Sequence, residues 1–75
     1  MATTYQGHYQ VVVKKGPAGE PIIVFEPFNG KSIPALKNDV FGIHMEFGTS
    51  FEDVEEIARA INKHMSSFFL TKFDG

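Results

Sequence analysis

The sequence contains no cysteine among its 75 residues, and positive charge is scarce. Without thiols the chain cannot form disulfide bonds, thiolate metal sites or a cysteine nucleophile. Lysine and arginine together number seven, and the formal net charge is −2. Because nucleic-acid affinity depends largely on clustered cations that neutralise phosphates, this composition does not favour nucleic acid as a partner.

Long apolar runs are missing as well. No stretch approaches the ~20 consecutive apolar residues of a membrane-spanning helix. The polar first residues lack the apolar segment of a signal peptide. Together with the missing thiols, which suit a reducing compartment, this predicts a cytoplasmic protein without a membrane partner.

Aromatic residues are plentiful, since eight phenylalanines and two tyrosines make up 13% of the chain. A domain of this size buries only about 60% of the surface that its unfolded chain exposes. Large rings bury much apolar area each and partly offset the small size. We expect a loose N-terminal tail over residues 1–7 and a single domain over residues 8–75.

Four segments have the composition of β-strands, and a fifth strand is expected to be short and irregular. The four are residues 8–14, 21–28, 40–47 and 68–73, and the irregular one is 31–37. Lys15-Gly16-Pro17-Ala18-Gly19-Glu20 predicts a turn, and Asn29-Gly30 predicts a two-residue type I′ hairpin that pairs Phe25 with Pro34. Gly42, inside a predicted strand, marks either a bulge or a close approach of a neighbour.

The hydrophobic period changes from two to 3.6 after residue 47, which predicts a helix that ends near Met65. Thr49 or Ser50 can cap this helix, and Thr49-x-x-Glu52 fits a capping box. The apolar stripe of the helix and one face of the preceding strand are expected to converge. The predicted core is therefore Phe41, Ile43, Met45, Val54, Ile57, Ala58 and Ile61.

These elements predict an α+β fold in the order β-β-β-β-α-β: a mainly antiparallel sheet of four or five strands with one amphipathic helix on one face. One helix covers a single face, and several strands are apolar on both faces. Soluble monomers rarely leave so much apolar area uncovered, so we expect a second copy or a protein partner there. The predicted contact residues are Val12, Ile22, Val24, Phe68 and Leu70.

Three polar residues form a weak candidate cluster on the face away from the predicted helix: His8, His44 and Glu46. Their spacing matches no metal motif, and a closed metal site needs more ligands. The glycines fit no phosphate-binding pattern, and no hydroxyl residue has a base positioned beside it in the sequence. We expect no catalytic residue, no cofactor and no bound metal.

The segment Gly48-Thr49-Ser50-Phe51-Glu52-Asp53-Val54-Glu55-Glu56-Ile57-Ala58-Arg59-Ala60-Ile61 resembles the strand-to-helix entry of HicB-type antitoxins. That family carries a Gly-x-Thr-x-x-Glu-Ala pattern before such a helix, and its strand order is similar. The chain departs from the family where Ile43-His44-Met45-Glu46-Phe47 replaces a Pro-Gly-Cys-like segment. The 75 residues also hold no appended DNA-binding segment, so the resemblance does not assign the chain to the family.

Three functions stay open on the sequence alone. The first is a small interaction or regulatory module that acts as a homodimer or as a subunit. The second, implied by the resemblance, is an antitoxin-like or nucleic-acid-associated regulator that binds only when assembled. The third is a small enzyme whose active site is shared between two chains.

Overall fold

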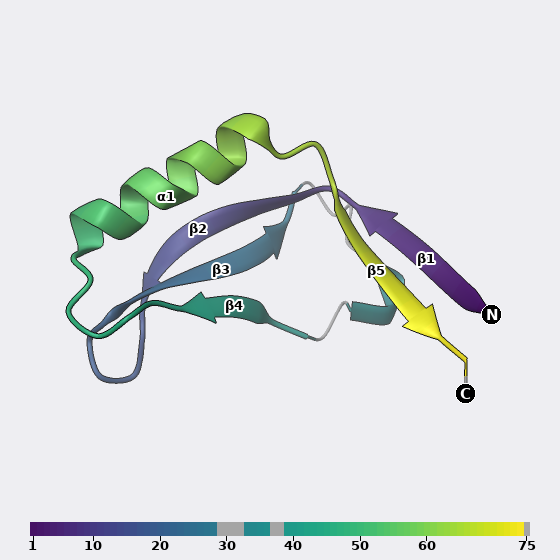
Figure 1. Ribbon diagram of the computed structural model, residues 1–75, viewed down its shortest axis with the longest axis horizontal. Coiled ribbons are helices and arrows are strands. Elements are labelled where there is room, and N and C mark those ends of the chain that lie inside the picture. Colours follow the sequence, from purple (N-terminus) through teal and green to yellow (C-terminus); the bar gives the residue numbers. More distant parts are fainter. Residues whose placement is uncertain (29–32, 37–38, 75) are drawn as a thin grey trace.

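The computed structural model describes residues 1–28, 33–36 and 39–74, and it has five strands and one α-helix in that part of the chain (Figure 1). In chain order the elements are β1 (Ala2–Gly7), β2 (Tyr9–Lys15), β3 (Pro21–Pro27), a 3₁₀ turn η1 (Pro34–Leu36), β4 (Phe41–His44), α1 (Phe51–His64) and β5 (Phe68–Phe73). The predicted α+β class is confirmed.

The strands form two separate antiparallel sheets, where the sequence had suggested one. A three-stranded sheet has the order β2-β3-β4, and β1 pairs with β5 in a two-stranded ribbon. The ribbon lies at one end of the molecule and carries both termini (Figure 1). A single residue, His8, separates β1 from β2, so the chain passes directly from the ribbon into the main sheet.

Two predicted segments have a different structure. The prediction of a loose tail over residues 1–7 is wrong, because Ala2–Gly7 is β1 and pairs along its whole length with β5. The predicted strand over residues 31–37 is wrong at Pro34–Leu36, which forms the 3₁₀ turn η1. The Asn29-Gly30 turn itself lies outside the described residues.

The hairpin register predicted for that turn is replaced by pairing with a more distant strand. Phe25 pairs with Phe41 of β4 in place of Pro34. The physical reason is that Pro34 has no backbone N–H and a fixed φ, which suits a turn better than a paired strand. The apolar residues around it, Ile33 and Leu36, are buried without joining a sheet.

The helix begins one residue later than the capping-box pattern indicated. Ser50 is the N-cap, and its hydroxyl accepts a hydrogen bond of 3.1 Å from the backbone N–H of Asp53. The Thr49 hydroxyl donates a hydrogen bond to the carbonyl oxygen of Glu46 at 2.7 Å. It therefore stabilises the preceding turn and does not cap the helix. With Ser50 as the cap, Glu52 and Asp53 lie in the first turn, where the helix dipole favours negative charge.

The core lies between α1 and the two strands β2 and β3, because α1 packs across these two strands (Figure 1). Its buried members are Val11, Ile23, Val54 and Ala58, and partly buried Val13, Phe25, Met45 and Ile61 pack against them. Val54 and Ala58 confirm the predicted stripe of the helix. The prediction is wrong for Ile43 and Ile57, which do not belong to the observed core, since 40% and 42% of these residues remain exposed. Ile43 belongs to β4, and Ile57 lies on the flank of α1 that faces away from β2.

This shift of the core predicts unequal costs for two matched truncations. Ile23 is fully buried, so replacing it with alanine should lower the free energy of unfolding by about 2–5 kcal/mol. The same change at half-exposed Ile57 should cost much less, because less apolar surface leaves the core. Urea denaturation of both variants measures the difference. Equal losses would contradict the placement of α1 over β2 and β3.

Candidate interaction surface

At one edge of the main sheet, a helix side chain bonds the outward backbone groups of one residue. The Val11 N–H of β2 donates to Asn62 Oδ1 at 2.8 Å, and Asn62 Nδ2 donates to the Val11 carbonyl oxygen at 2.8 Å. The amide group of Asn62 thus gives β2 the pair of hydrogen bonds that another strand would give. An edge strand whose backbone groups are already bonded cannot pair with a further strand at that position.

The same contact reveals which backbone groups are free at the other edge. In an antiparallel sheet, successive residues direct their N–H and C=O groups to alternate sides. Because Val11 points its N–H and C=O away from β3, its partner Phe25 points both groups toward β4. On β4, Phe41 and Ile43 therefore point their N–H and C=O groups toward β3. The N–H and C=O groups of Gly42 and His44 therefore point outward from β4, where the described part of the chain offers no further strand.

Gly42 is required by the tight pairing of β4 with β3. A Cβ atom at this position would lie 2.9 Å from the carbonyl oxygen of Ile23. Of the two interpretations that the sequence allowed, the close approach of a neighbour is confirmed. The glycine also leaves the outer face of β4 without a side chain beside His44.

Apolar side chains lie along this open edge. Val40 is 79% exposed and Ile43 is 40% exposed. The helix adds Ile57, which is about 140° around the helix axis from Asn62. Because Asn62 lies over the edge of β2, Ile57 faces the β4 side. We call the side chains of Val40, Ile43 and Ile57, with the outward backbone groups of Gly42 and His44, the β4 edge surface.

The ribbon of β1 and β5 exposes a second apolar area. Phe69 and Phe73 are 65% and 80% exposed and share one face of the ribbon with Thr4 and Thr71, whose hydroxyls lie 2.8 Å apart. The opposite face carries Phe68, which anchors the ribbon to the body. Its ring lies near three rings of the main sheet, with centroids 4.9 Å from Tyr9, 5.3 Å from Phe25 and 6.0 Å from Phe41.

The structure brings together three of the five contact residues predicted from the sequence. Val12 pairs with Val24, and Ile22 lies beside them on the sheet face away from α1. Phe68 belongs to the aromatic cluster on the helix side, and Leu70 lies in the ribbon. The five residues therefore do not form one continuous patch.

An ion pair crosses the face that holds Val12 and Val24. Lys14 follows Val12 on β2, and Glu26 follows Val24 on the antiparallel β3, so the two charged residues lie at opposite ends of the valine pair. Lys14 Nζ nevertheless reaches Glu26 Oε1 at 2.8 Å. The aliphatic portions of the Lys14 and Glu26 side chains extend over the valines, which helps to keep the exposure of Val24 at 8%.

The predicted polar cluster does not assemble. His8 lies beside Phe28, whose N–H donates to the His8 carbonyl oxygen at 2.7 Å, whereas His44 pairs with Ile22 at the other end of β3. Six residues of strand separate these positions, a distance of about 20 Å. Within residues 1–28, 33–36 and 39–74, no three histidine, aspartate or glutamate side chains are grouped so that they could hold a metal ion.

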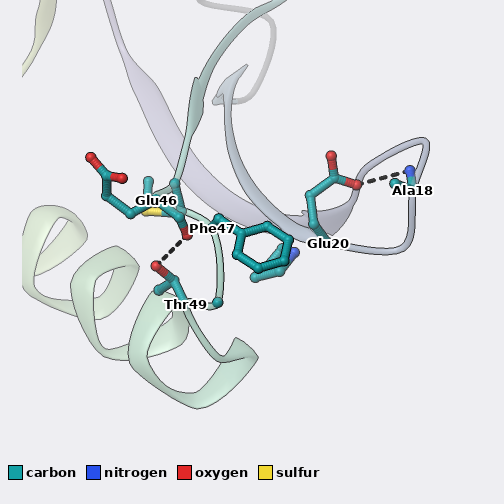
Figure 2. A pocket seen from close by; sticks show the side chains of 8 residues that line it. Ala18, Glu20, Glu46, Phe47 and Thr49 are labelled. Atoms are coloured by element: carbon teal, nitrogen blue, oxygen red, sulfur yellow. Dashed lines mark hydrogen bonds between the residues drawn. The ribbon is translucent and has the colours of Figure 1, made fainter.

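A pocket of about 480 Å³ lies between the β2–β3 turn and the loop that leads into α1 (Figure 2). Figure 2 shows the ring of Phe47 between Glu20 and Glu46, with the Glu46 carboxylate pointing away from Glu20. The Glu20 carboxylate accepts a hydrogen bond of 2.9 Å from the N–H of Ala18, which fixes it to its own turn. The two carboxylates do not converge on a common point, so they cannot act together as an acid and a base.

Comparison of the chain with protein-family models, with curated proteins and with solved structures found no match. In the described part of the chain, no helix has both the length and the apolar character needed to cross a membrane. The interaction surface is therefore assigned from the geometry of the chain itself.

The β4 edge surface could not be predicted from the sequence, because Ile43 and Ile57 have the same periodic spacing as core residues. Periodicity alone does not show which strands the helix covers.

The closing role of Asn62 gives a prediction about the stability of the fold. Replacing Asn62 with alanine removes both hydrogen bonds to Val11 and should lower the free energy of unfolding by about 1–3 kcal/mol. Lys63→Ala is the matched control, because it changes the next position on the exposed side of the helix. Chemical denaturation of both variants compares them, and equal stability of the two would contradict the role of Asn62.

Proposed function

We propose that the chain is a small interaction module that works in an assembly, as a homodimer or as a subunit beside another protein. The observation that carries this proposal is the size of the exposed surface. The chain exposes 5654 Å² for a mass of 8.4 kDa. A compact monomer of this mass exposes about 4,600 Å², which leaves a surplus of about 1,000 Å². A typical stable interface covers about 800 Å² of each partner, so a surface of this size has room for one.

The chemical character of the exposed surface supports the same proposal. Large apolar side chains are exposed in two regions, the β4 edge surface and the outer face of the ribbon. A two-stranded ribbon has little stability by itself in water. Covering its aromatic face, or the open edge of the main sheet, would stabilise a domain that has few buried residues of its own.

The other two functions draw less support from the described residues. A nucleic-acid-associated regulator needs unpaired cations on one surface, and Lys14 is already paired with Glu26. A shared active site needs converging polar groups, and His8 and His44 lie at opposite ends of the sheet. We therefore propose the interaction module, and we place it in the cytoplasm, where a protein without cysteine has no need of oxidising conditions.

Sedimentation of the purified protein tests the proposal. We expect the weight-average mass to rise from one chain toward two between low and high micromolar concentration. The melting temperature should rise with protein concentration as well, because association stabilises the folded state by mass action. A monomer at every concentration, with a constant melting temperature, would rule out the homodimer. The subunit role would then require a partner protein that co-purifies in stoichiometric amount.

A further inference from the structure

We propose that the pocket between the β2–β3 turn and the loop before α1 receives a basic side chain, arginine or lysine, from a partner protein (Figure 2). This inference rests on the proposed function, because it names the chemistry of the partner and one place where that partner binds. The pocket lies at the end of the main sheet away from the ribbon (Figure 1). Its occupation therefore does not depend on the aromatic face of the ribbon.

One wall of the pocket is the ring of Phe47, which a tight turn presents to solvent. Phe47 is fully exposed. The carbonyl oxygen of Glu46 accepts two hydrogen bonds that hold this turn, from the Thr49 N–H at 3.1 Å and from the Thr49 hydroxyl at 2.7 Å. Gly48 has a φ of 88°, a conformation that glycine adopts without strain. The backbone that carries the ring is therefore fixed before a partner binds, which lowers the entropic cost of binding.

Another wall carries the carboxylate of Glu20, which is also held in place. Its Oε1 accepts the hydrogen bond from the Ala18 N–H, and the backbone carbonyl oxygen of Glu20 accepts one of 2.7 Å from the Gly16 N–H. A Cβ atom at Gly16 would collide with this carboxylate, so the glycine leaves the room into which the carboxylate folds. An ionised carboxylate offers about four acceptor positions, so the bond to Ala18 leaves capacity for a charged donor.

The rest of the lining is neutral and mostly apolar: Ala18, Pro21, Met45, Gly48 and Thr49. The two charged side chains at the pocket are both carboxylates, Glu20 and Glu46, and in the described part of the chain neither forms an ion pair with lysine or arginine. A long cationic side chain matches this lining. Its stem contacts apolar groups, and its charged head meets the carboxylate and the ring face. An anion would be repelled, and an apolar side chain would take water from the Glu20 carboxylate without replacing it.

The start of α1, which follows the pocket directly, does not oppose a cation. A helix N-terminus carries a partial positive charge, which by itself would repel a basic side chain. Glu52 and Asp53 lie in the first turn of α1 and offset that charge. The region around the pocket therefore keeps a negative character.

The charge of the chain favours a different protein over a second copy as the partner. The net charge is −2, and the one arginine in the sequence is Arg59. Arg59 follows Glu55 by four residues on α1, a spacing at which opposite charges attract each other. A protein with surplus positive charge would be attracted to the whole chain, which speeds encounter. The partner that we infer is a basic protein with an exposed arginine or lysine.

Titration with a short arginine peptide tests the pocket. The probe is glycyl-arginyl-glycine with blocked ends, and its control contains citrulline, which keeps the shape of arginine without the charge. Binding is followed through the backbone amide NMR shifts of the full chain. We expect the arginine peptide to shift the amides of Glu20, Phe47 and Thr49 at millimolar concentration, because one exposed cation–π contact and one exposed ion pair each contribute little. The citrulline peptide should leave these amides unchanged.

Three variants locate the binding within the pocket, and circular dichroism confirms that each is folded. Glu20→Gln removes the fixed carboxylate, and Phe47→Leu removes the ring but keeps apolar bulk. Each should weaken binding of the arginine peptide by about threefold. Glu46→Gln is the matched control, since it removes the same charge from a side chain that points away from Glu20 (Figure 2). It should change binding much less.

The outcomes separate this site from the proposed function. Equal binding of both peptides, or no shift at these amides, overturns the pocket. Equal weakening by Glu20→Gln and Glu46→Gln also overturns it, because attraction to net charge alone then explains the binding. Self-association that Arg59→Gln abolishes would place a second copy in the pocket and overturn the basic partner. A chain that associates but fails the titration keeps the proposed function and loses this site, whereas a monomer without a partner loses the proposed function whatever the titration gives.

Discussion

The contact between the Asn62 amide and the backbone of Val11 anchors the helix to the main sheet. It fixes the C-terminal half of α1 over the outer edge of β2, so the apolar stripe of the helix lies across β2 and β3. The helix is too narrow to cover a third strand as well, since helices and strands pack with spacings of about 10 Å and 4.8 Å. Asn62 therefore occupies the β2 edge at Val11, and the helix leaves β4 largely uncovered.

The local structure could be predicted from the sequence because short-range physical rules specify it. The turn between β2 and β3, the start of α1 at Ser50 and the alternating faces of β2 follow from backbone preferences, capping and periodicity over a few residues. Gly42 was recognisable as an unusual position for the same reason. Each of these features depends on residues that are neighbours in the chain.

The long-range pairing could not be predicted in the same way. Ala2–Gly7 is polar and contains small residues, which is typical of a tail, yet it pairs with the strongly apolar β5 at the far end of the chain. The pairing of Phe25 with Phe41 likewise crosses a segment whose Asn-Gly turn signal favoured a local hairpin. The candidate surface could not be predicted either, because Ile43 and Ile57 have the spacing of core residues. Only the position of the helix shows that they are exposed.

The proposed association gives the weakest part of the fold its missing support. β4 is four residues long, lies at an edge and receives little cover from α1. A short strand with one bonded neighbour contributes little to stability, because few hydrogen bonds and little burial offset the entropy of ordering it. A partner along the open edge would give β4 a second neighbour. Association at this edge and the ordering of β4 would then be thermodynamically linked, because a partner that binds only the ordered strand stabilises it.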